Sequence, residues 1–233
     1  GQNNVQGAAD MGCQPHQGAG YLPVADKKIQ NFYSEKYGVV HPTKAGLKIP
    51  EIFDAAINKE IKALWIIGED VVQTDPNSAH VAKAMNALDL LVVQEIFMSE
   101  TAKHADVVLP GTTFLEKEGT FTNTERRVQR VNRAAKPLPG TKPDGIIVTE
   151  MMQKLGYDQK LYDADEVLEE IADVVSFFKG ITRERLGKLG LQWPVKEDGT
   201  DTKILHEKEF KLGKGRIKYF DWKESSEIEK NKK

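Results

Sequence analysis

Three short apolar runs, separated by segments with helical spacing, constrain the fold of this chain more than any other feature. They cover Lys62 to Ile67, Leu90 to Val93 and Asp106 to Leu109, and each is typical of a strand covered on both faces. A helix is predicted from Asp75-Pro76 to about Leu88, because Asp suits the N-cap and Pro the first helical position. Met98 to His104 predicts a shorter helix. This alternation predicts an α/β fold with a parallel, Rossmann-like sheet and flanking helices.

Mixed α+β segments follow this alternation, and two further helices precede it. Helical spacing of apolar residues predicts two helices before it, over 26–37 and 48–59. The rhythm stops near Thr113. Beyond that point, we expect paired strands at 120–122 and 128–131, helices at 144–155, 165–174 and 183–189, and a strand at 213–220. The predicted domain boundaries divide the chain into 1–113, 114–222 and a charged tail at 223–233.

Composition excludes several classes of protein. The formal net charge of -2 offers no general attraction to nucleic acid or to an anionic membrane. The single cysteine, Cys13, excludes an internal disulfide and, alone, cannot hold a four-cysteine cluster. No apolar run approaches the roughly 20 residues of a membrane span, and no N-terminal signal is evident. The histidines show no metal-ligand spacing, so no metal site is predicted.

Polar clusters follow the first two predicted strands. Gly68-Glu69-Asp70 and Gln94-Glu95 stand where the carboxyl ends of parallel strands meet, which is where open sheets bind ligands. Glycine admits a ligand close to the backbone, and a carboxylate accepts hydrogen bonds from ribose hydroxyls. Asp75 would cap a helix whose free N–H groups face a phosphate. We therefore predict a nucleotide site. The alternative is that Gly68 only ends a strand and that the carboxylates are solvated loop residues.

A second polar cluster lies beyond the sheet. Its Asn and Glu side chains suit the donor edge of a purine, and its Arg side chains suit a phosphate. The alternative is a solvated β-hairpin with alternating charges. The cluster comprises Glu116, Glu118, Asn123, Glu125, Arg126, Arg127 and Arg130.

Several segments together carry a family resemblance. The opening Gln-Asn-Asn-Val-Gln-Gly-x-x-Asp-Met-Gly, the stretch Gly119 to Gln129 and the late stretch Gly187 to Pro194 occur in the order typical of one family. The chain resembles the later part of the catalytic (alpha) subunit of molybdopterin-dependent formate dehydrogenases, in the molybdopterin oxidoreductase superfamily. The opening segment is the most discriminating, because the Gly119 to Gln129 stretch is shared with related enzymes.

The resemblance implies a cofactor and residues that bind it. Family enzymes hold molybdenum or tungsten between two molybdopterin guanine dinucleotides. Residues 1–113 would be part of the α/β domain that binds this cofactor, and 114–222 would be later segments of the same region. Gln2 would lie beside the metal end, and Gly111 would contribute only backbone donors where relatives often carry Ser. The full set of predicted cofactor-binding residues is Gln2, Gly68, Glu69, Gln94, Glu95, Gly111, Asn123 and Asp144.

The resemblance also implies what this sequence lacks. The family's metal ligand, its catalytic arginine and the four cysteines of its 4Fe-4S cluster have no match here, nor does its C-terminal dinucleotide-binding domain. We therefore expect a fragment with no catalytic residue. Its expected partners are the rest of the subunit, iron–sulfur electron-transfer subunits, and formate and carbon dioxide, in the cytoplasm. Two alternatives stay open: a segment of another molybdopterin oxidoreductase, nitrate reductase-like or complex I large-subunit-like, and a non-catalytic nucleotide-binding module.

Overall fold

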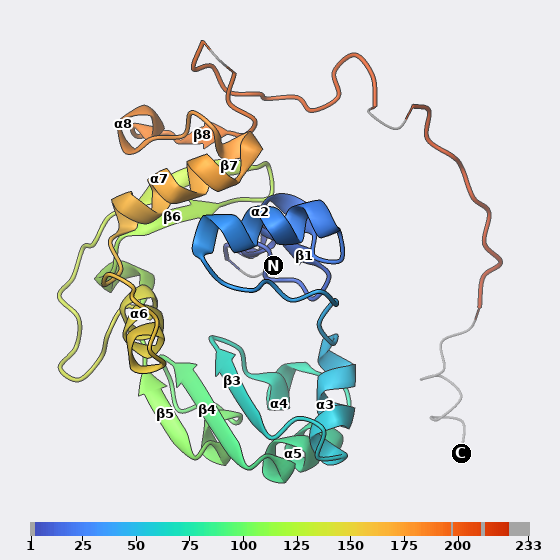
Figure 1. The fold of residues 1–233 in the computed structure, drawn as a ribbon, viewed down its shortest axis with the longest axis vertical. Helices are drawn as coiled ribbons and strands as arrows, with labels where there is room; N and C mark the ends of the chain where they lie inside the picture. The colour runs from blue at the N-terminus through green and yellow to red at the C-terminus, as the bar shows by residue number, and fades with distance from the viewer. Residues whose placement is uncertain (1–2, 197, 211–212, 224–233) are drawn as a thin grey trace. The chain divides into compact units, whose positions relative to one another are not determined.

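A computed structural model describes residues 3–196, 198–210 and 213–223 of the chain (Figure 1). The chain divides into two units, Gly1–Asp201 and Thr202–Lys233. The first unit contains all the helices and strands of the described residues. The domain boundaries expected at 113/114 and 222/223 concern the intact family domain and stay predictions.

A parallel three-stranded sheet confirms the central prediction. It consists of β3 (Ala63–Ile67), β4 (Leu90–Glu95) and β5 (Val107–Pro110), in that spatial order. Helices α3 (Ile49–Ile57), α4 (Val71–Thr74) and α5 (Ser78–Ala87) and the 3₁₀ turn η2 (Ala102–His104) contribute to one core with it. Alternate strand residues supply that core, because successive side chains point to opposite faces of a sheet.

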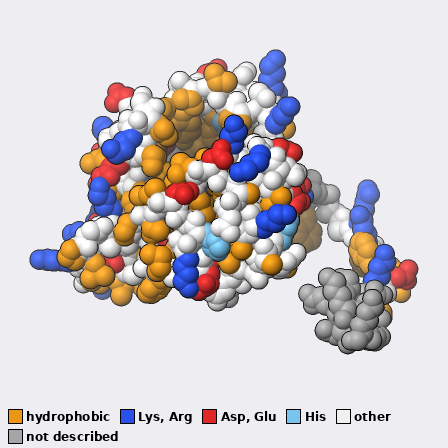
Figure 2. Space-filling model, turned by 90° about the horizontal axis from the view of Figure 1, so that it is seen from below, with side chains coloured by type: hydrophobic (Ala, Val, Ile, Leu, Met, Phe, Trp, Pro, Cys, Tyr) orange, Lys and Arg blue, Asp and Glu red, His pale blue; other side chains and the backbone are white. Residues whose placement is uncertain are grey.

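The other face of this sheet is less covered than expected. Ile67, Leu90 and Val107 remain 47%, 42% and 43% exposed. The prediction that the strands are covered on both faces is therefore wrong for this face within the described residues. Figure 2 shows other hydrophobic side chains at the surface as well, lying among charged ones.

Local sequence explains where most helices begin and end. Helix α2 (Lys27–Tyr37) begins after Asp26, whose carboxylate accepts from the Lys28 N–H at 2.8 Å, and it ends at Gly38 in the left-handed region. Helix α3 begins after Lys48, whose N–H donates to Glu51 at 2.8 Å. The predicted start at Asp75-Pro76 is wrong.

Helix α5 begins after Asn77 instead, because Asp75 is the C-cap residue of the preceding short helix α4. Asn77 adopts φ 63° and makes no side-chain cap, so the chain turns once more before the helix starts. The predicted phosphate-facing helix end at Asp75 is absent for the same reason.

A second core surrounds an antiparallel sheet. The sheet consists of β6 (Gly119–Thr122), β7 (Arg127–Val131) and β8 (Leu191–Gln192). Tyr33 from α2 packs in this core with residues of β7, α7 (Ala164–Val174), η4 (Ser176–Phe178) and α8 (Arg183–Leu186). Residues between Met11 and Tyr37 thus pack with segments far along the sequence.

The remaining elements of the first unit are short or lie between the cores. They are α1 (Val5–Asp10), β1 (Gln17–Gly18), η1 (Ala19–Tyr21), β2 (Leu22–Pro23), η3 (Phe114–Glu116) and α6 (Asp144–Lys154). Helix α6 agrees with the prediction at 144–155. Helix α8 stops three residues before the predicted end at Leu189.

The strand predicted at 213–220 is wrong. The described residues from 202 onward, 202–210 and 213–223, form no helix or strand. A strand forms only where another strand supplies its hydrogen bonds, and no partner lies beside this segment in the described chain. Residues 224–233 of the predicted tail lie outside the described residues.

Candidate functional site

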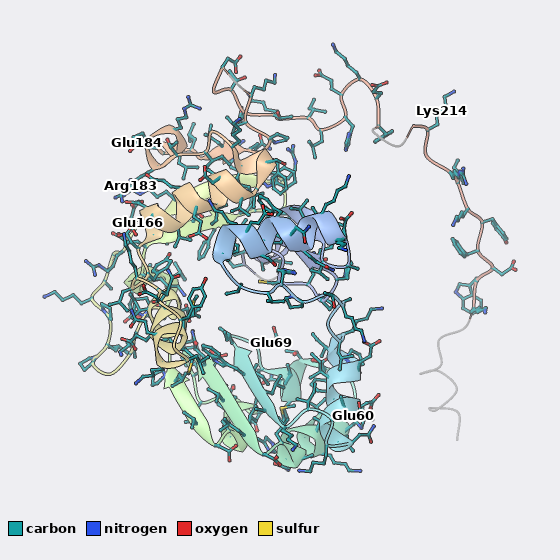
Figure 3. The ribbon with its side chains drawn as sticks, in the orientation of Figure 1. Glu60, Glu69, Glu166, Arg183, Glu184 and Lys214 are labelled. Atoms are coloured by element: carbon teal, nitrogen blue, oxygen red, sulfur yellow. The ribbon has the colours of Figure 1, made fainter. Side chains whose placement is uncertain are left out.

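The carboxyl ends of the three parallel strands form one continuous edge. The Gly68 N–H donates to the Gln94 carbonyl at 2.9 Å, and the Gly111 N–H donates to the Glu95 carbonyl at 3.1 Å. Gly68 has φ 64°, a conformation that favours glycine and turns the chain out of β3. Figure 3 shows Glu69 at this end of β3. The segments Gly68-Glu69-Asp70 and Gln94-Glu95, which follow the first two predicted strands, are therefore neighbours at this edge.

Asp144 joins this edge from a distant part of the sequence. It is the first residue of α6, and its Oδ1 accepts from the Gln94 Nε2 at 2.8 Å. Its Oδ2 forms an ion pair with Lys117. A Cβ at Gly111 would lie 3.1 Å from Asp144 Oδ1, so glycine leaves the room in which this carboxylate sits. The Gly111 backbone donor that the resemblance left available is already bonded within the sheet.

Two buried polar atoms at the edge have no hydrogen-bond partner within the described residues. Gln94 and Thr112 are each 1% exposed, and the unpaired atoms are the Gln94 Oε1 and the Thr112 Oγ1. Buried polar atoms are almost always paired, because leaving one unpaired costs about 1–3 kcal/mol. The edge therefore carries more polar capacity than the chain itself satisfies.

Asp70 organises the loop beside this edge. Its carboxylate accepts from the Thr101 hydroxyl at 2.6 Å, from the Thr101 N–H at 2.8 Å and from the Glu100 N–H at 3.2 Å. The Thr101 hydroxyl in turn accepts from the Val72 N–H at 3.0 Å. Burial raises the pKa of Asp70, but the hydrogen bonds from Thr101 and Glu100 outweigh it, so the pKa lies below its ordinary value of 3.8.

We expect this loop to make stability depend on pH. A group with a lowered pKa in the fold contributes stability that is present above its ordinary pKa and is lost as pH falls through the lowered value. The unfolding free energy should fall below about pH 4, and the Asp70→Asn variant should show a shallower fall. Urea unfolding between pH 6 and pH 3 measures both slopes. Parallel curves for the two proteins would contradict the assignment to Asp70.

A cavity of about 170 Å³ lies beside the Lys117–Asp144 ion pair. Residues from β6, β7 and the start of α6 line it together with Tyr162. The lining consists of Lys117, Glu118, Gly119, Thr120, Phe121, Val131, Pro143, Asp144, Gly145 and Tyr162. Asp144, which Gln94 holds, is thus one of the residues that line this cavity.

The second polar cluster makes hydrogen bonds within the β6–β7 hairpin and to Gln192 and Trp193. The Asn123 Oδ1 accepts from the Glu125 N–H at 3.1 Å and from the Arg127 N–H at 2.9 Å, which shapes the turn between β6 and β7. Arg127 donates to Glu125 Oε1 at 3.0 Å and to Gln192 Oε1 at 2.8 Å. Arg126 donates to the Trp193 carbonyl, and its guanidinium lies 5.3 Å from the centre of that indole.

The predicted site residues therefore divide into three groups. Those at the sheet edge are brought together by the fold, and they are Gly68, Glu69, Gln94, Glu95, Gly111 and Asp144. Asn123 serves the hairpin turn, and its role toward a cofactor stays a prediction. Gln2 lies outside the described residues.

Two contributors to the edge escaped the sequence analysis. Lys117 reaches Asp144 across 27 residues, and Thr112 lies buried after β5. Neither position carries a sequence signal, because an isolated Lys or Thr is ordinary in a loop. Only their placement beside Gln94 and Asp144 makes them candidates.

The described residues contain neither a metal-ligand cluster nor a membrane-spanning helix. No group of three or more His, Cys, Asp or Glu side chains in them is arranged to hold a metal ion. No helix in this part of the chain is long and apolar enough to cross a membrane.

Comparison with known proteins identifies relatives of the chain. It is 44% identical over 233 residues to the alpha subunit of the F420-dependent formate dehydrogenase of Methanocaldococcus jannaschii, covering 98% of this chain and 34% of that protein. It is 42% identical over 221 residues to the Staphylococcus haemolyticus protein named "Putative formate dehydrogenase SH0748", covering 94% of this chain and 22% of that protein. The chain thus spans 22–34% of the length of these two curated relatives.

A solved structure with a similar fold and a family model also match this chain. Acetylene hydratase from Pelobacter acetylenicus superposes with a TM-score of 0.51 at 23% identity, over 65% of this chain and 22% of that chain, which shows a shared fold. A model of the molybdopterin oxidoreductase family matches residues 2–154. The chain belongs to the molybdopterin oxidoreductase family.

Proposed function

We propose that this chain is the cofactor-binding part of a formate dehydrogenase catalytic subunit and that its sheet edge binds a molybdopterin guanine dinucleotide. The family implies a molybdopterin cofactor, and the relatives described above are named as formate dehydrogenases. In the intact subunit, the bound metal, molybdenum or tungsten, would take two electrons from formate and pass them to iron–sulfur centres. The residues of this chain would bind and orient the cofactor.

The observation that carries the proposal is the position of Asp144. The fold brings this carboxylate to the end of β4 and fixes it with the buried Gln94 amide. Guanine presents two adjacent donors, the 1-NH and the 2-amino group, which match a carboxylate. Glu69 lies just beyond β3 and Glu95 is the last residue of β4, and both are suited to ribose hydroxyls.

The unpaired polar atoms fit the same proposal. Gln94 Oε1 and Thr112 Oγ1 lack partners in the described chain and belong to the same edge. A nucleotide and its ordered waters bring additional donors to such an edge. Gln2 and Asn123 remain candidate contacts elsewhere along the cofactor.

The native polypeptide that contains this sequence tests the enzyme proposal. Purified protein should carry molybdenum or tungsten together with iron, reduce an artificial electron acceptor only when formate is present, and release GMP on acid hydrolysis. A polypeptide without either metal, or one that releases no GMP, would overturn the proposal.

The Asp144→Ala variant tests the site itself. We expect the cofactor-free protein to bind GMP more tightly than AMP, and the substitution to weaken GMP binding at least about ten-fold, since reading a base edge is worth about 1–3 kcal/mol. AMP binding should change little. Titration calorimetry measures both ligands. The Asp173→Ala variant is the control, because the Asp173 side chain is 76% exposed and forms a surface ion pair with Lys36.

A further inference from the structure

We propose that Lys117 determines base specificity in this site by donating a hydrogen bond to the 6-oxygen of guanine while Asp144 accepts from the 1-NH and the 2-amino group. This inference rests on the proposed nucleotide site. It adds a cationic donor to a site that the sequence analysis built from carboxylates, amides and glycines.

The first step is that Asp144 is held from one side and remains available on the other. Gln94 Nε2 binds its Oδ1 at 2.8 Å, and Gln94 is 1% exposed, so this contact is shielded from solvent. The Asp144 side chain is 37% exposed and lines the cavity. The carboxylate thus has a buried anchor and an open side.

Lys117 lies on that cavity side and pairs with the carboxylate. Its ammonium pairs with Asp144 Oδ2, and its side chain is 27% exposed and lines the same cavity. A partly exposed ion pair contributes little to stability, so sharing it with a ligand carries a small penalty. An ammonium has three donors, and the pair with Asp144 uses one of them.

The third step is that the backbone of Lys117 is anchored. The preceding residue, Glu116, is 8% exposed. Its carboxylate accepts from the Thr113 N–H at 2.9 Å, from the Thr113 hydroxyl at 3.1 Å and from the Leu138 N–H at 3.0 Å. Lys117 therefore extends from a fixed point and has only its own side-chain freedom.

Together these groups present a donor beside an acceptor, which distinguishes the two purines. Guanine offers an acceptor at position 6 and donors at positions 1 and 2. Adenine offers a 6-amino donor, which would face the ammonium of Lys117, and an N1 acceptor, which would face the carboxylate of Asp144. Guanine thus satisfies both residues, whereas adenine sets a donor against the ammonium and an acceptor against the carboxylate.

The experiment compares GMP, IMP and AMP on the cofactor-free full chain. IMP keeps the 6-oxygen and the 1-NH but lacks the 2-amino group, so it reports on Lys117 without that contact. In the Lys117→Met variant, GMP and IMP should each bind at least about ten-fold more weakly and AMP about as before. The Lys117→Arg variant keeps a cation with donors and should retain most of the preference for GMP.

Controls separate specificity from folding and from the proposed function. Lys103→Met removes a different ion pair, between Lys103 and Glu100, which is about half exposed and does not line the cavity. This variant should change neither the GMP/AMP nor the IMP/AMP affinity ratio. Equal weakening of GMP and AMP in Lys117→Met would show a structural ion pair only and overturn the inference. Wild-type protein that binds GMP no better than AMP would instead overturn the proposed nucleotide site. Circular dichroism of each variant checks that it folds.

Discussion

Replacing Asp10 with alanine should lower the unfolding free energy of the chain by about 3 kcal/mol, because three partly buried donors would lose their buried acceptor. Asp10 is fully buried. It accepts from Gln6 Nε2 at 2.9 Å, from the Tyr21 hydroxyl at 2.7 Å and from Trp193 Nε1 at 2.9 Å. Urea unfolding of the Asp10→Ala variant measures the change.

The donors of this network come from distant parts of the chain. Burial and the Asp10 carboxylate raise the pKa of Tyr21 to about 12, so Tyr21 stays a donor at neutral pH. Trp193 lies 183 residues from Asp10 and packs at a tilt against Phe177, with ring centres 4.3 Å apart. Asp10 therefore ties α1 to the second core.

A matched control isolates the effect of burial. Asp54→Ala removes a carboxylate that is 67% exposed and pairs with His80, and its cost should stay below about 1 kcal/mol. Equal losses for Asp10→Ala and Asp54→Ala would show that the buried network contributes nothing special.

The substitution Leu91→Ala should destabilise the chain by about 3 kcal/mol, whereas Leu90→Ala should cost less than about 1 kcal/mol. The two leucines are adjacent in β4 and point to opposite faces of the sheet. Leu91 is 1% exposed in the first core, while Leu90 is 42% exposed on the opposite face. Truncation of a buried leucine leaves a cavity, and truncation of an exposed one does not.

Denaturant unfolding of both variants tests this difference. Similar losses for Leu90→Ala and Leu91→Ala in the isolated chain would mean that the second face is also buried in solution, for instance by association between copies. Measuring the unfolding midpoint at two protein concentrations distinguishes those cases, because only an associated state depends on concentration.

The anchoring of α1 bears on the proposed function. The Asn4 Oδ1 accepts from the Thr122 N–H at 2.8 Å, which ties the start of α1 to β6. The opening segment that resembles formate dehydrogenases is thus held at both ends, by Asn4 and by Asp10. In the proposed function, this anchoring fixes the described part of that segment against β6.

Local patterns determined most elements of this protein. Short β-rich apolar runs gave β3, β4 and β5, and apolar spacing gave α2, α3, α6 and α7, because side-chain period and capping are properties of a few consecutive residues. The start of α5 was missed because the short α4 and a left-handed Asn77 intervene, and nothing local announces them. The strand expected at 213–220 failed because a strand also requires a partner.

The candidate site shows the same division. The sequence alone placed Gly68, Glu69, Gln94 and Glu95 at strand ends, since parallel strands align their carboxyl ends whatever else the chain does. Only the tertiary structure decided that Asp144 lies against Gln94, that Lys117 pairs with it and that Asn123 serves a turn. Those contacts join residues up to 50 positions apart, and such pairs are set by how whole elements pack, which no local pattern encodes.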